Sequence, residues 1–212
     1  RQMCIRDRSS PLWLGATVRS FFVATVTAFL ATAIGIGAAL AMGHSRSRWS
    51  GALFAVFLAP MIVPRIVIAV GMFYLFARLG LVATNAGLII GHTVLALPFT
   101  VVAITAVLKT YDSRLDQAAW TLGANRWRTI VKITLPIIKG GLIAAFLFAF
   151  ITSFDELTIA IFISGGLATT LPKQMWDDMI LQLNPTLAAV STVVFVLVTT
   201  LLVVAERFRR NA

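Results

Sequence analysis

Five long apolar segments constrain this chain more than any other feature, because each is long enough to cross a lipid bilayer. A hydrocarbon core of about 30 Å is crossed by roughly 20 helical residues. The segments cover residues 18–42, 52–77, 86–108, 137–163 and 187–205. None shows the alternating pattern of a membrane β-barrel strand. We therefore predict an all-α, polytopic membrane helical bundle that forms a single transmembrane domain over residues 11–212.

The composition supports an integral membrane protein, since 59% of the residues are hydrophobic and only 12% are charged. A water-soluble enzyme is excluded on this ground. The net charge of +10 does not indicate nucleic-acid binding, because the basic residues lie in short loops beside apolar segments. The single cysteine, Cys4, excludes an intramolecular disulfide and gives no metal cluster. We expect a membrane protein that contacts lipid and binds no metal.

Lysine and arginine are unevenly distributed between the loops, which predicts the orientation of the chain in the membrane. Two loops and the C-terminal tail are rich in cations, namely Arg46 and Arg48; Lys109, Arg114, Arg126, Arg128, Lys132 and Lys139; and Arg207, Arg209 and Arg210. The opposite loops contain only Arg78 and Lys173, the latter close to Asp177 and Asp178. Because cytoplasmic loops carry the excess of cations, we expect the loop 109–136 and the C-terminus to be cytoplasmic.

The N-terminal residues do not fit this topology. Five spans with a cytoplasmic tail place the N-terminus outside, yet four arginines lie there, at positions 1, 6, 8 and 19. We expect residues 1–10 to be non-native or disordered, and a sixth span to have preceded Ser10. A cleaved signal peptide is the alternative, although no apolar stretch precedes Ser10.

The loop 109–136 contains two stretches with helical character. Residues 115–122 lack glycine and proline, and two adjacent alanines there allow another surface to approach closely. Gly123 suits the end of that helix, because glycine adopts the left-handed conformation at little steric cost. Asn125 is a favourable N-cap for a second helix over residues 125–134, and Pro136 suits the first turn of the next span.

The spacing of this loop resembles the "EAA" loop of permease subunits in ATP-binding cassette (ABC) importers, which reads EAA, three residues, Gly, nine residues, then I-x-L-P. The anchors here are Gln117, Ala118, Ala119, Gly123, Ile133, Leu135 and Pro136. All match except Gln117, which replaces a glutamate and removes its charge. The phrases TSFDELTIAIFISGG, TLPKQMWDDM and NPTLAAVSTVV are also similar to permeases of the spermidine/putrescine-type branch.

This resemblance implies a bacterial inner-membrane permease of usually six spans, of which five are retained here. It implies partners as well: a second permease in a homodimer or heterodimer, two cytoplasmic ATPases that use ATP and Mg²⁺, and an extracytoplasmic solute-binding protein. The helix around Gln117 would dock on the ATPase, and the solute would most readily be a polyamine, with other small polar solutes as alternatives. The chain itself contains no GxxxxGK[ST] phosphate loop, so we expect it to catalyse no reaction and bind no cofactor.

Three charged residues within the apolar segments are candidates for the solute path, because a charge in hydrocarbon needs a partner or a cavity. Asp155 and Glu156 lie in the outer part of the fourth segment, and Arg65 follows Pro64 at a similar depth in the second. The carboxylates suit a cationic solute, but an interhelical salt bridge is an equal alternative and Arg65 is its obvious partner. Pro60 and Pro64 favour a broken helix around that arginine.

Residues 173–183 read as a short amphipathic helix on the outer surface, since apolar residues recur there at helical spacing. Its Trp176, Asp177 and Asp178 are candidates for docking a solute-binding protein, with an interfacial helix that closes the bundle as the alternative.

His92 has no partner set for a metal and is expected to be a packed or interfacial histidine. An ion-coupled secondary carrier using the intramembrane acids, or a membrane scaffold without a path, are the competing function classes.

Overall fold

The computed structural model describes residues 11–44, 49–165 and 169–181, together with 191–193, 196, 198–200, 203 and 207. All the regular secondary structure in this part of the chain is helical, which confirms the all-α prediction. The helices are α2 (Pro11–His44), α3 (Trp49–Ile62), α4 (Arg65–Leu79), α5 (Asn85–Thr110), α6 (Arg114–Thr121), α7 (Arg126–Thr129), the π-helix η1 (Ile130–Thr134), α8 (Leu135–Ile137), α9 (Lys139–Phe154), α10 (Thr158–Ile163) and α11 (Leu171–Leu181).

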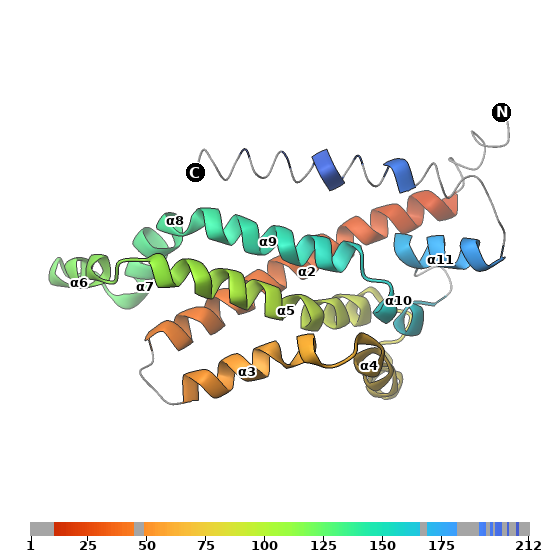
Figure 1. Cartoon of the computed structure of the whole chain (residues 1–212), viewed down its shortest axis with the longest axis horizontal. Helices are drawn as coiled ribbons and strands as arrows, with labels where there is room; N and C mark the ends of the chain where they lie inside the picture. Colours follow the sequence, from red (N-terminus) through yellow and green to blue (C-terminus); the bar gives the residue numbers. More distant parts are fainter. Residues whose placement is uncertain are drawn as a thin grey trace.

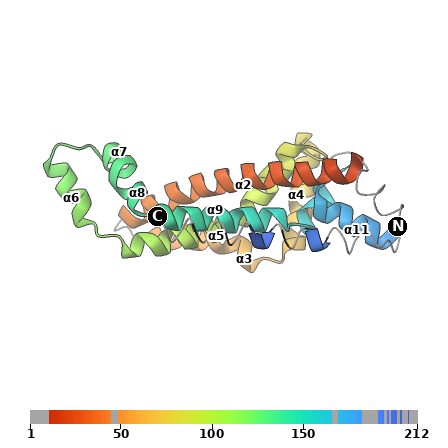
Figure 2. The same cartoon turned by 90° about the horizontal axis from the view of Figure 1, so that it is seen from above.

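Helices α2, α5 and α9 lie along one another and form the centre of the bundle (Figures 1 and 2). Two of them, α2 and α5, are each long and apolar enough to cross a membrane. Up to four spans are present in the described residues if each of two bent helix pairs is counted as one. The fifth predicted span, residues 187–205, lies largely outside the described residues.

The second apolar segment is broken, as its two prolines predict. Helices α3 and α4 meet at an angle of 99°, and the break falls at Val63 and Pro64. Pro64 has no N–H to continue the hydrogen-bond ladder of α3, and its carbonyl instead accepts from Val67 N in the first turn of α4 at 2.9 Å. Arg65 therefore begins a new helix that runs in a different direction.

The fourth apolar segment, expected to be one span over residues 137–163, is divided between α9 and α10. The chain first bends by 77° between Ile137 and Lys139, and α9 then ends at Phe154. Glu156 explains the second interruption, because its Oε1 accepts a hydrogen bond from Ile159 N at 3.2 Å. A carboxylate that satisfies backbone N–H groups favours a new helix start over continuation of the old helix.

Small residues let the central helices approach closely. Ala31, Gly35 and Ala39 lie one turn apart on the buried face of α2. A Cβ atom at Gly35 would lie 2.9 Å from Thr100 Oγ1 of α5, and that hydroxyl donates a hydrogen bond to the Ala31 carbonyl at 3.1 Å. This glycine- and alanine-rich stretch of α2 thus packs closely against α5 along one of its faces.

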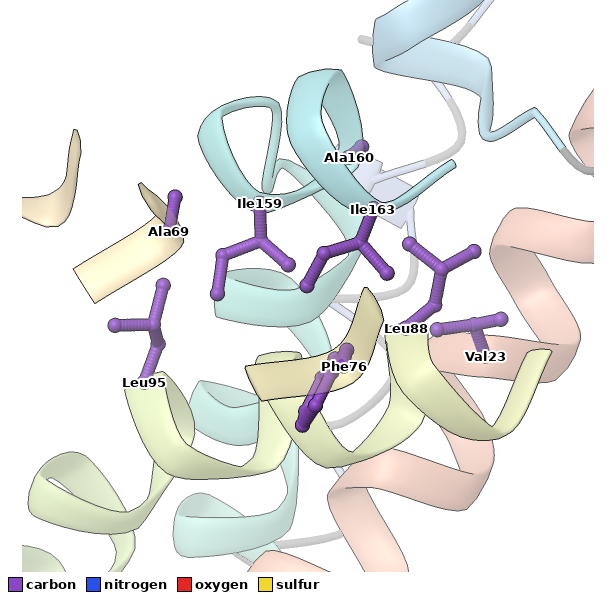
Figure 3. Close-up of a cluster of buried hydrophobic side chains, with 8 residues drawn as sticks. All are labelled: Val23, Ala69, Phe76, Leu88, Leu95, Ile159, Ala160 and Ile163. Carbon is purple, nitrogen blue, oxygen red and sulfur yellow. The ribbon is translucent and has the colours of Figure 1, made fainter. Parts of the chain in front are cut away.

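A buried apolar cluster joins the broken helices to the central bundle at one end of the molecule (Figure 3). Its members come from α2, α4, α5 and α10, and they are Val23, Ala69, Phe76, Leu88, Leu95, Ile159, Ala160 and Ile163. Because α4 and α10 both contribute, the two segments that follow the helix breaks pack against each other. This packing positions the charged residues at the two breaks.

Candidate coupling loop and candidate solute path

The loop between α5 and α9 projects beyond the helical bundle at one end, carrying α6 and α7 (Figures 1 and 2). Gly123 follows α6 with a φ of +83°, the left-handed conformation expected at this glycine. Asn125 caps α7 as predicted, since its side chain accepts a hydrogen bond from Arg128 N at 2.8 Å. The two helices predicted in this loop are therefore confirmed, although the second is divided into α7 and η1.

The loop anchors selected from the sequence lie in different environments. Gln117 and Ala118 are exposed on α6, whereas Ala119 is buried. The exposed surface of this loop is apolar to an unusual degree, because Leu122 is 88% exposed and the side chains of Leu115, Trp120 and Trp127 are also exposed. Uncovered aromatic and aliphatic side chains on a projecting loop are typical of a surface that a partner covers.

The helix type changes at the start of the fourth segment, close to the anchors Ile133, Leu135 and Pro136. Leu135 N donates to the carbonyl of Ile130, five residues back, which is the bonding of a π-helix. Pro136 then lies in the first turn of α8, directly after the π-helix. π-Helical turns of this kind are frequent at functional sites.

A buried polar network lies beneath α6 and was not predicted from the sequence. The carboxylate of Asp116 is only 5% exposed, and its Oδ1 accepts hydrogen bonds from Tyr111 Oη at 2.6 Å and from Thr134 Oγ1 at 3.3 Å. Partial burial, and next the hydrogen bond to Asp116, raise the pKa of Tyr111 above its usual range, so the phenol stays a donor at neutral pH. The three residues are separated by 5 and 18 positions in sequence, which is no recognisable motif.

The candidate solute-path charges lie at the two helix breaks. Arg65 begins α4, and its guanidinium Nη1 donates to Glu156 Oε2 at 3.0 Å. Glu156 is almost completely buried, with 1% of its side chain exposed, whereas 53% of the Arg65 side chain is exposed. The pairing that the sequence suggested for Arg65 is confirmed, and its partner is Glu156.

Asp155 differs from its neighbour. It is exposed at the C-terminal end of α9, and within the described part of the chain its carboxylate has no hydrogen bond or ion pair. Glu156 satisfies both of its oxygens inside the protein, one with Arg65 and one with Ile159 N. The two adjacent acids therefore have separate environments: Glu156 is bound within the protein, whereas the Asp155 carboxylate has no partner among the described residues.

His92 is a packed residue, as expected. It is buried in α5, and its Nδ1 lies 2.8 Å from Ser153 Oγ at the end of α9. This contact connects α5 with the turn immediately before Asp155. His92 thus supports the position of the break without belonging to a cluster of metal ligands in the described residues.

Helix α11 lies at the end of the bundle opposite α6 (Figure 1). Leu171 N donates to Ser20 Oγ of α2 at 2.7 Å, which fixes the start of α11. Asp177 pairs with Lys173 and Asp178 accepts from Gln174 Nε2 at 3.0 Å, so both acids have partners on their own helix. Trp176, Met179 and Ile180 are exposed at helical spacing. The last two residues of the predicted helix 173–183 lie outside the described residues.

Comparisons with known proteins agree on one family. Residues 14–211 match the family described as "Binding-protein-dependent transport system inner membrane component". A spermidine/putrescine transport system permease protein PotC of Haemophilus influenzae is 30% identical over 196 residues, which cover 92% of this chain and 76% of that protein. The putrescine transport system permease protein PotI of Escherichia coli K12 is 32% identical over 177 residues, covering 81% of this chain and 62% of that protein.

The fold has a close counterpart among solved structures. A chain of the MetNI methionine ABC transporter in an inward-facing conformation superposes with a TM-score of 0.80 at 19% identity, covering 94% of this chain and 95% of that one. An amino acid ABC transporter superposes with a TM-score of 0.73 at 14% identity. At these identities the likeness establishes the fold, and it is the fold of an ABC importer permease.

Proposed function

This chain belongs to the family of binding-protein-dependent transport system inner membrane components, and we propose that it is the transmembrane subunit through which an ATP-driven importer takes up a polyamine. The observation that carries the proposal is its similarity, over most of its length, to permeases of spermidine and putrescine systems. Membership of the family makes it a multi-pass inner-membrane protein with ATPase and solute-binding partners in general.

The projecting loop is the surface proposed for docking the ATPase. Its anchors Gln117, Ala118, Ala119 and Gly123 lie on and after α6, beside the exposed apolar side chains of Leu122 and Trp127. These exposed apolar side chains would supply hydrophobic contact area, and Gln117 has no charge to form the ion pair that a glutamate at this position could make. The ATPase would bind ATP and Mg²⁺, because this chain has no phosphate loop of its own.

The loop is proposed to face the cytoplasm, together with the C-terminus. Six basic residues lie in or directly beside it, Lys109, Arg114, Arg126, Arg128, Lys132 and Lys139. The opposite end of the bundle carries α10 and α11, with the acids Asp177 and Asp178 (Figure 1). An excess of cations at one end supports this orientation through the positive-inside rule.

The solute path is proposed to pass Asp155 near the outer end of the bundle. Its exposed carboxylate, without an internal partner in the described residues, suits the ammonium groups of a polyamine. Glu156 and Arg65 would hold the two broken helices together. Because Arg65 is half exposed, the surface of α3 and α4 around it suits water or a second permease better than lipid. That permease could be a second copy or a homologue.

Helix α11 is proposed to contact the solute-binding protein from the outer surface. Trp176 offers an exposed aromatic ring, while Asp177 and Asp178 supply acceptors beside it. An interfacial helix in the headgroup region remains the alternative for the same exposed residues. Loss of binding-protein affinity in Trp176→Ala, with unchanged insertion, would favour docking.

The test is reconstitution of this chain with its ATPase, second permease and binding protein in proteoliposomes, with labelled putrescine as solute. We expect uptake that requires ATP hydrolysis and the binding protein. An ion-coupled carrier is the main alternative, and it would give uptake without ATP that an ionophore abolishes. Competition by spermidine but not by amino acids would support the polyamine assignment, and the reverse would indicate another small polar solute.

A further inference from the structure

We infer that Asp116 is the positioning residue that connects the ATPase-docking helix α6 to the two membrane helices on either side of it. The inference rests on the proposed function, because it concerns how a movement of α6 would reach the membrane. The carboxylate lies in the first turn of α6, and its partners Tyr111 and Thr134 belong to the two neighbouring segments.

The two partners lie where the loop joins the membrane helices. Tyr111 is the residue that directly follows α5 and caps its C-terminal end. Thr134 is the last residue of η1 and directly precedes α8, from which the chain continues into α9. Both hydroxyls donate to the same oxygen, Asp116 Oδ1. One carboxylate oxygen therefore joins α6 to the end of α5 and to the segment η1–α8, which leads into α9.

The burial and charge of this group make the connection strong. Both side chains are buried, since Asp116 is 5% exposed and Thr134 is 1% exposed. A hydrogen bond to a charged acceptor favours the arrangement in which the bond is made over the one in which it is broken by roughly tenfold or more. Displacement of α6 relative to either membrane helix would break at least one such bond.

Apolar packing around Asp116 is incomplete, which leaves the polar link as the main local constraint. Two cavities adjoin it, of about 210 Å³ and 160 Å³. Trp120 of α6 and Leu40 of α2 line both of them. Since interiors without voids transmit displacement through packing, a helix bordered by two cavities depends more on directed bonds. Asp116 supplies those bonds.

The experiment compares Tyr111→Phe and Thr134→Val in the complete reconstituted complex. Each change removes one hydroxyl and keeps the size of the side chain. Two quantities are measured: putrescine taken up per ATP hydrolysed, and the rate of amide hydrogen exchange over residues 114–121. We expect uptake per ATP to fall by at least about threefold, a fraction of the tenfold expected for one such bond, while hydrolysis continues. We also expect exchange in α6 to accelerate.

Matched controls are available at sites away from the loop. Tyr74→Phe removes the other tyrosine hydroxyl, from an exposed side chain on α4. Thr17→Val removes a hydroxyl that donates within α2, to the Trp13 carbonyl. Neither control should change the uptake ratio or the exchange of α6. An effect of the same size in the controls would overturn the inference.

The outcomes separate this inference from the proposed function. A wild-type complex without ATP-driven uptake contradicts the proposed function, and the exchange measurement then still decides whether Asp116 holds α6. Unchanged exchange in both variants overturns the inference whatever the solute. A lower yield of complex with an unchanged uptake ratio also overturns it, because that result describes folding alone.

Discussion

Replacing Arg65 by methionine should destabilise the protein through the carboxylate that it leaves behind. Glu156 has 1% of its side chain exposed and would lose the cationic partner that it has in the described residues, while methionine keeps an unbranched apolar stem in place of that of Arg65. Removing one partner of a fully buried pair costs about 3–5 kcal/mol. An exposed pair contributes only about 0.2–1 kcal/mol.

This pair falls between those limits, because 53% of the Arg65 side chain is exposed. We therefore expect the free energy of unfolding to fall by about 2 kcal/mol. For a chain of this length that corresponds to a decrease in Tm of about 4–8 °C. Arg78→Met, at the other end of α4, is the matched control and should change Tm little.

The assay is a double-mutant cycle with Glu156→Gln, followed by thermal unfolding in detergent. The amide oxygen of glutamine still accepts from Ile159 N, so this change removes the charge and keeps the helix cap. The double variant should lose clearly less stability than the two single variants summed. The reason is that Glu156→Gln removes the buried charge that Arg65→Met alone leaves without a partner. If the losses add within about 0.5 kcal/mol, the two side chains are not coupled and the reasoning is wrong.

Three further predictions follow from individual residues. Asp155→Asn should reduce putrescine uptake at limiting concentration without lowering Tm, since this carboxylate has no internal partner in the described residues; equal uptake would remove it from the path. Gly123→Val should cost about 1–2 kcal/mol locally, because φ is +83° there, and should lower ATP-driven uptake by the inserted complex. In a Tyr74→Phe background, absorbance titration should show that Tyr111 ionises above its ordinary range. The stability of the fold should fall as the pH rises through the pKa of Tyr111. Asp116→Asn should lower the pKa of Tyr111.

The sign of the pH effect follows from linkage. The folded protein holds the Tyr111 proton more tightly than the unfolded chain does, because its pKa is raised in the folded state. The contribution to stability is therefore complete below the unfolded pKa of about 10 and is lost above it. A titration in which Asp116→Asn leaves the Tyr111 pKa unchanged would show that the carboxylate does not act on the phenol.

Structural features that depend only on residues adjacent in sequence could be predicted from the sequence. Apolar length identified the helices α2 and α5, and the end of α6 at Gly123 and the cap at Asn125 followed from local backbone chemistry. The break before Arg65 was also predictable, since proline removes a backbone donor wherever it stands. Each of these inferences needs only a few consecutive residues.

The division of the fourth segment was not predicted, although its cause lies in the same sequence. Glu156 lies between α9 and α10, where its carboxylate accepts from Ile159 N in the first turn of α10 and pairs with Arg65, 91 positions away. Apolar composition alone gave no reason to interrupt residues 137–163. A polar side chain competes with a helix only when its other interactions make that competition favourable.

The sequence by itself determined the class of this protein, because hydrophobic length and loop spacing are properties of the chain before it folds. Only the tertiary structure decided the different roles of adjacent acids. Glu156 is buried against Arg65 and Asp155 is exposed, while Asp116 connects two membrane helices that the sequence separates. The environment of a charge depends on which segments surround it, and packing between distant segments sets that environment.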